Sequence, residues 1–112
     1  MVDKTRLLFR GGLRTFTKTY EDATVETFHY KARTPNELAA HFGAENALKD
    51  DAEGGVARQR LRAKLIATSL CTESGEPLLT ASEAELIPGS LKAEICNLIA
   101  IGSNDVGDAG TG

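Results

Sequence analysis

The sequence Thr34-Pro35-Asn36-Glu37 decides the fold, because it marks the point where a strand pattern changes to a helical one. The Thr34 hydroxyl can accept a hydrogen bond from an amide of the first helical turn, and Pro35 has a backbone φ suited to that turn. Glu37 can accept a hydrogen bond from the Thr34 amide in return, which completes a capping box. We therefore expect a helix over residues 35 to 42, preceded by strands.

Strand patterns lie upstream of this switch. Residues 14 to 20 are rich in threonine and aromatic residues, which favour a pleated surface. In residues 25 to 33 polarity alternates, so that Phe28, Tyr30 and Ala32 share one side. We expect a small N-terminal antiparallel sheet or hairpin with its aromatic side against the helices.

Helical patterns lie downstream of the switch. Residues 44 to 53 fit either a short helix or a loop, and Gly54-Gly55 predicts a break before a central core helix over residues 56 to 72. A second capping box, which begins at Thr80, predicts a short helix over residues 81 to 87. The fold class is therefore α+β, a small sheet followed by a mainly helical bundle of four to five short helices.

The last helix is expected over residues 90 to 101, after Pro88-Gly89, and carries an apolar stripe. Either the chain's own core or a partner must cover this stripe, so its residues are both core candidates and candidate partner-binding residues. The stripe consists of Leu91, Ile95, Leu98 and Ile99. The predicted core comprises Leu61, Leu65, Ile66, Leu70, Leu91, Ile95 and Leu98.

The chain has 112 residues, of which 41% are hydrophobic and only 5% aromatic. That length suits one domain with a mainly aliphatic core, which we place at residues 1–102, followed by a flexible Gly-rich tail at 103–112. No segment approaches the roughly eighteen apolar residues of a membrane span, and the first residues lack a secretory apolar core. We expect a cytoplasmic protein that binds no membrane.

Charge is distributed unevenly along the chain, which has a formal net charge of -3. The N-terminal part of the chain is mildly basic, whereas after residue 72 Lys92 is the only basic residue among many acidic ones. Complementary ends could guide head-to-tail association of copies, although an acidic end could equally serve solubility. Self-association into oligomers is therefore expected.

Basic residues also flank the core helix, with Arg58 and Arg62 on one flank and Arg60 and Lys64 on another. These side chains could neutralise nucleic-acid phosphates, but the acidic total and the lack of a recognisable motif favour extended side chains beside a buried arc. Arg58 and Arg62 remain candidate partner-binding residues, and nucleic acid is a less favoured partner.

Motifs for phosphate-loop, dinucleotide, zinc-protease or hydrolase chemistry do not occur in the sequence. Cys71 and Cys96 are far apart and are interpreted as small buried hydrophobes rather than as metal ligands or a disulfide. His29 and His41 are interpreted as surface residues. We expect no catalytic, cofactor-binding or metal site, and no enzyme.

The connection between the core helix and the next helix carries a family resemblance. Residues 65–80, LIATSLCTESGEPLLT, join an apolar helix end that closes on Ser69-Leu70-Cys71 to a Gly-containing turn, then to Pro77-Leu78-Leu79 and the Thr80 cap. This order resembles the tail assembly chaperones of long-tailed bacteriophages, and the resemblance extends over about residues 25 to 102.

The resemblance implies a non-enzymatic protein of the host bacterial cytoplasm, absent from the mature virion. Such a protein binds the phage tape-measure protein, protects its apolar helices and recruits the tail-tube protein. This chain would be the short form, without the frameshift extension found in many of these phages. A structural head-tail connector or tail-completion protein, and a small nucleic-acid-binding regulator, remain alternatives.

Overall fold

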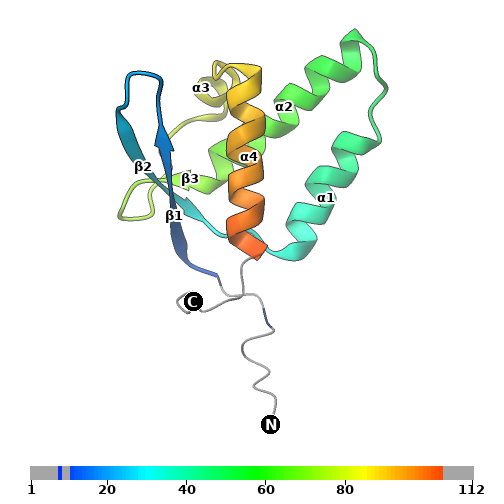
Figure 1. Ribbon diagram of the computed structural model, residues 1–112. Helices are drawn as coiled ribbons and strands as arrows, with labels where there is room; N and C mark the ends of the chain where they lie inside the picture. The colour runs from blue at the N-terminus through cyan, green and yellow to red at the C-terminus, as the bar shows by residue number, and fades with distance from the viewer. Residues whose placement is uncertain (1–7, 9–10, 105–112) are drawn as a thin grey trace.

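The computed structural model describes residue 8 and residues 11–104. The fold is α+β, as expected, with a three-stranded antiparallel sheet and helices packed beside it. In Figure 1, the last helix runs between the hairpin of the first two strands and the pair formed by the first two helices. The elements in chain order are β1 (Leu13–Thr19), β2 (Val25–Lys31), α1 (Pro35–Asn46), α2 (Ala52–Ser69), β3 (Leu70–Cys71), α3 (Ala81–Glu85) and α4 (Gly89–Asn104).

The sheet has the strand order β1-β2-β3. β1 and β2 form an antiparallel pair with Phe16 opposite Phe28, and the two rings stack with their centroids 5.1 Å apart. Tyr30, farther along β2, is only 2% exposed. The predicted aromatic side of the sheet therefore packs against the helices, as expected.

Both capping boxes are confirmed. The Glu37 amide donates to Thr34 Oγ1 over 3.1 Å, and the Thr34 amide donates to Glu37 Oε1 over 3.0 Å. Thr80 and Glu83 exchange the same two hydrogen bonds over 2.9 and 3.1 Å. Hydrogen bonds from Thr34, aided by the nearby Arg33, lower the pKa of Glu37. Both predicted helix starts are therefore correct.

The predicted break at Gly54-Gly55 is wrong, because both glycines lie in the first turns of α2. Asp51 caps this helix, accepting a hydrogen bond from the Gly54 amide over 2.7 Å. A Cβ atom at residue 54 would collide with the Lys49 carbonyl, so this glycine permits a close approach of the backbone. Local capping thus outweighs the low helix propensity of two glycines.

The predicted helix ends need correction as well. α1 continues past residue 42 to Asn46, because Glu45 in its last turn forms an ion pair with α2. α2 ends at Ser69 rather than at residue 72, because the next two residues form β3 and pair with β2. α3 is also shorter than predicted, since it ends at Glu85 rather than at residue 87.

α4 begins at Gly89 and ends at Asn104, whereas the prediction was residues 90 to 101. Ser103 is 2% exposed, and its hydroxyl accepts a hydrogen bond from the Arg33 amide over 2.9 Å. This contact with the start of α1 explains the extra helical turn. Two residues assigned to the flexible tail, Ser103 and Asn104, are therefore helical; residues 105–112 lie outside the described part of the chain.

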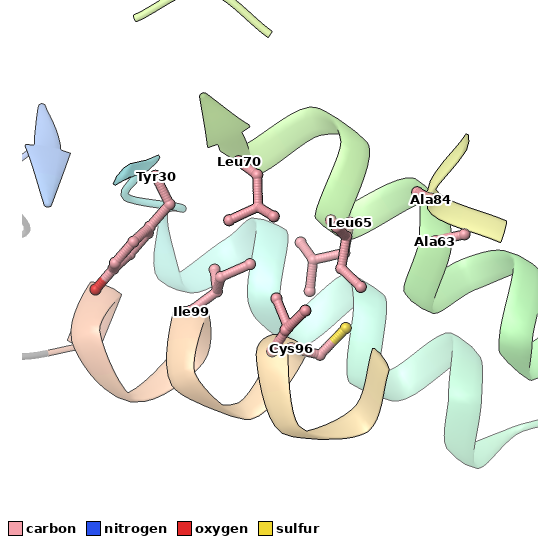
Figure 2. Close-up of a cluster of buried hydrophobic side chains, with 9 residues drawn as sticks. Tyr30, Ala63, Leu65, Leu70, Ala84, Cys96 and Ile99 are labelled. Carbon is pink, nitrogen blue, oxygen red and sulfur yellow. The ribbon is translucent and has the colours of Figure 1, made fainter. Parts of the chain in front are cut away.

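The core lies where α2, α4 and the sheet meet (Figure 2). Four predicted core residues are buried, namely Leu65, Ile66, Leu70 and Ile95. The other three, Leu61, Leu91 and Leu98, are only half-buried. The remaining members of the buried cluster are Tyr30, Ala63, Ala84, Cys96 and Ile99.

Truncation of the core should be costly. Leu65→Ala is expected to lower the free energy of unfolding by about 2–4 kcal/mol, because it removes buried methyl groups and leaves a cavity. Urea unfolding followed by circular dichroism measures the change. Leu86, which is 84% exposed, supplies the control, and Leu86→Ala should change stability by less than about 0.5 kcal/mol. A loss that small at Leu65 would contradict the described core.

Candidate functional site

The apolar stripe of α4 faces the chain's own core. Ile99 is 0% exposed and Ile95 is 5% exposed, while Leu91 and Leu98 are half-buried. The sequence left open whether the chain's own core or a partner covers the stripe. For the two isoleucines, it is the chain's own core. A partner therefore cannot reach Ile95 and Ile99 without opening the core, and we look for a binding surface elsewhere.

Two of the four basic residues on the predicted flanks of α2 form ion pairs within the described structure. Arg62 turns toward α1, where its Nη2 lies 3.0 Å from Glu45 Oε1 and its Nε donates to the same oxygen over 3.1 Å. Arg60 Nε lies 4.0 Å from Glu85 Oε1, and Arg58 is half-buried. A nucleic-acid backbone needs a continuous basic surface, and these ion pairs with carboxylates interrupt it.

Glu45 links two helices through a mostly buried carboxylate. Its side chain is 8% exposed, and its second oxygen lies 2.6 Å from His41 Nε2. Because an ionised carboxylate only accepts hydrogen bonds, the imidazole is the donor in this contact. His41 is also 8% exposed in its side chain, so its interpretation as a surface histidine is wrong. We call His41, Glu45 and Arg62 the polar tie.

The spacing of the polar tie explains what sequence could and could not find. His41 and Glu45 are four residues apart, which places them on one face of a helix. Arg62 is seventeen residues beyond Glu45, and only the folding of α2 against α1 brings the two together. The first contact is readable from the sequence, whereas the second is not.

An open groove of about 350 Å³ lies between α1 and α2. Its lining includes the apolar residues Ala40, Ala44, Leu61 and Leu65, together with Thr68. Charged and polar side chains form its rim, namely Arg33, Glu37, His41 and Lys64. We refer to this feature as the α1–α2 groove; the sequence analysis missed it because it exists only between two packed helices.

Among the described residues, one cationic side chain of the rim has no carboxylate partner. Arg33 Nη1 lies 3.4 Å from Glu37 Oε2, and His41 contacts Glu45. Lys64 is exposed and has no carboxylate partner among the described residues. The groove thus combines an apolar floor with a free positive charge, an arrangement that suits an amphipathic ligand.

The two cysteines are buried and are not joined by a disulfide. Burial raises the pKa of Cys96 to about 12, with a further increase from Glu45 that Arg62 opposes. The Cys96 thiol also lies 3.6 Å from the Arg62 carbonyl. Such a thiol is protonated at neutral pH, unlike the activated cysteines of nucleophilic sites. In the part of the chain that is described, no group of three potential ligands could hold a metal ion.

In comparisons with protein-family models, curated proteins and solved structures, none matched this chain. Among the described residues, no helix has both the length and the apolar character needed to cross a membrane. The α1–α2 groove and the polar tie beside it are therefore the features from which a function can be argued.

Removing the contacts of the polar tie should destabilise the packing of α1 against α2. Glu45→Ala is expected to lower the free energy of unfolding by about 1.5–3 kcal/mol, because Arg62 loses a mostly buried acceptor. Chemical denaturation gives the value, with Glu21→Ala in the exposed β1–β2 turn as the control, expected to change stability by less than about 0.5 kcal/mol. Equal stabilities of the two variants would show that the tie does not hold α1.

Thiol reactivity tests the described burial. At pH 8 the thiolate fraction of Cys96 should be on the order of 10⁻⁴, since its pKa is about 12. Cys96 should therefore react slowly with a disulfide reagent in the folded protein, and Cys71 should do so because it is buried; both should react rapidly after unfolding. Absorbance of the released thiol reports both rates. Rapid native reaction of Cys96 would contradict its place in the core.

Proposed function

We propose that this chain is a non-enzymatic phage tail assembly chaperone that binds an apolar helical segment of the tape-measure protein in the α1–α2 groove. The observation that carries this proposal is the groove itself, an open space of about 350 Å³ between two helices that is lined in part by apolar side chains. The identity of the partner comes from the resemblance of the connection at residues 65–80. The function class comes from the groove, which suits binding.

The spacing of the lining residues supports a helical ligand. On α1 they are residues 37, 40, 41 and 44, and on α2 they are residues 61, 64, 65 and 68. Both sets follow the i, i+3, i+4, i+7 spacing of a single helix face. These two faces line the groove, and the side-chain ridge of a third helix can pack between them.

The rim adds a chemical preference to this shape. A partner helix would cover the apolar floor and bring the residues beside its own apolar stripe close to Lys64. Because Lys64 has no acid partner in the described structure, an acidic residue at that position of the ligand would be favoured. The preferred ligand is therefore an apolar helix flanked by acidic residues.

Other parts of the proposal rest on the sequence and on the family resemblance, not on the groove. They are recruitment of the tail-tube protein, self-association into oligomers, location in the host bacterial cytoplasm and absence from the mature virion. A connector or tail-completion protein would instead remain in the particle, so mass spectrometry of purified virions distinguishes the two. The nucleic-acid alternative is less favoured because Arg62 and Arg60 are ion-paired within the chain.

A charge placed in the groove should abolish binding. Ala44 and Ala39 are both exposed on α1, but only Ala44 lines the groove. Ala44→Glu should weaken binding of the tape-measure protein at least about tenfold, because the partner helix would desolvate the added carboxylate at a cost of more than about 1.4 kcal/mol. Ala39→Glu adds the same charge outside the groove and should bind as the unchanged chain does.

Co-expression provides the measurement. The tape-measure protein should be soluble and co-purify with the unchanged chain and with Ala39→Glu, and should aggregate with Ala44→Glu. Circular dichroism establishes that both variants fold. If the tape-measure protein is equally soluble without this chain, the chaperone proposal fails; if a folded Ala44→Glu variant protects it fully, the groove is not the binding surface.

A further inference from the structure

β1 occupies one edge of the sheet, and two hydrogen bonds show which of its backbone groups face outward. The Tyr20 amide donates to the Thr24 carbonyl over 2.8 Å, and the Ala32 amide donates to the Gly12 carbonyl over 3.0 Å. In an antiparallel ladder, hydrogen-bonded positions alternate along each strand. Even-numbered residues of β1 therefore bond to β2, and the odd-numbered residues direct their N–H and C=O groups to the open edge.

Among the described residues, no strand pairs with the outer edge of β1. Natural sheets commonly guard an edge with proline, a bulge or charged side chains, including charges that point inward. β1 contains no proline, and its register with β2 is continuous from Leu13 to Thr19. The odd-numbered side chains are uncharged and exposed: Leu13, Thr15, Thr17 and Thr19.

Both charged side chains of β1 are held by α4 instead. Lys18 Nζ lies 2.9 Å from Glu94 Oε2, and Arg14 Nη1 donates to the Gly102 carbonyl. Neither cation extends along the exposed face of the strand to repel a neighbouring strand. The edge therefore offers a row of backbone donors and acceptors beside small, β-favouring side chains.

α4 adds an exposed apolar residue beside this edge. Glu94 faces β1 through its contact with Lys18, and Ile101 follows it by seven residues, which is close to two helical turns. Ile101 therefore lies on the β1 side of α4, where it is 69% exposed. Leu13, at the start of the strand, is 46% exposed. The edge and these two side chains together define what we call the β1 edge surface.

We propose that the β1 edge surface pairs with the same surface of a second copy, so that two antiparallel β1 strands join two sheets into one. A second copy fits because the surface is self-complementary: an antiparallel neighbour places threonine opposite threonine, a cross-strand pair that stabilises sheets. No opposite charge is needed from the partner. The two-fold arrangement closes on itself and yields a dimer.

This inference rests on the self-association included in the proposed function and identifies its surface. The helices that line the groove, α1 and α2, lie on the other side of α4 from β1 (Figure 1), so pairing through β1 leaves the groove open. Dimerisation and binding of the tape-measure protein can therefore be tested separately.

Sedimentation over a range of concentrations gives the dimer dissociation constant. Thr17→Pro removes an outward N–H and leaves every hydrogen bond to β2 in place, because proline is tolerated where the amide faces away from the ladder. It should raise the dissociation constant at least tenfold. Thr17→Val keeps the amide and the β propensity, and should dimerise as the unchanged chain does.

A second variant covers the case in which Thr17→Pro fails to fold. Ile101→Asp places a charge on the exposed β1 side of α4 and should also raise the dissociation constant at least tenfold. Leu86→Asp, at another exposed apolar residue, is its control and should not change dimerisation. Circular dichroism establishes folding of each variant.

Hydrogen exchange of the backbone amides reports directly on pairing between the two β1 strands. The amides of Thr15 and Thr17 should exchange more slowly at concentrations where the dimer forms. A chain that stays monomeric at every concentration would overturn both self-association and this surface. If folded Ile101→Asp and Thr17→Pro variants dimerise as strongly as the unchanged chain, and the amides of Thr15 and Thr17 gain no protection, the surface is overturned and self-association is left standing. The co-expression result for the groove is independent of either outcome.

Discussion

Burial of one face of α4 is the constraint on which the other elements depend. Ile99 on this face is fully buried against α2 and the sheet, and Tyr30 of β2 reaches the last turns of α4. The approach there is so close that a Cβ atom at Gly102 would collide with the Tyr30 hydroxyl. Without α4, the hairpin and the α1–α2 pair would have little apolar surface in common.

α1 is held differently from the rest of the fold. Only Leu38 gives it a buried apolar side chain, and its other attachments are polar. At its start the Arg33 amide donates to Ser103 of α4, and near its end Glu45 contacts Arg62 of α2. Between these two attachments, α1 and α2 do not pack tightly against each other, and the α1–α2 groove lies between them. The groove is thus a consequence of how α1 is attached.

The proposed binding functions use surfaces that this arrangement leaves uncovered. In Figure 1, the α1–α2 pair and β1 lie on opposite sides of α4, and the groove is lined by residues of α1 and α2. A helical ligand in the groove would replace water on an apolar floor, whereas strand pairing would satisfy backbone groups at the edge of the sheet. Because the two interactions use different elements, a dimer could present two grooves, which would favour binding to a long partner through more than one contact.

The sequence by itself determined the features that depend on residues close together in the chain. The helix starts after Thr34 and Thr80 were predictable because each capping box spans only four residues, and the alternation around Tyr30 identified β2. Helical spacing also identified buried Leu65 and Ile66. These signals give the α+β class without knowledge of any long-range contact.

The tertiary structure decided the features that join distant residues. Leu70 became a strand residue because β2, forty residues earlier, offered hydrogen bonds that local helix propensity could not oppose. Ile95 and Ile99 became core residues because α2 and the sheet covered them, and Arg62 became part of the polar tie because α1 placed Glu45 beside it. Hydrogen bonds within one helical turn follow from the sequence, but burial and ion pairing between elements depend on which surfaces the folded chain brings together.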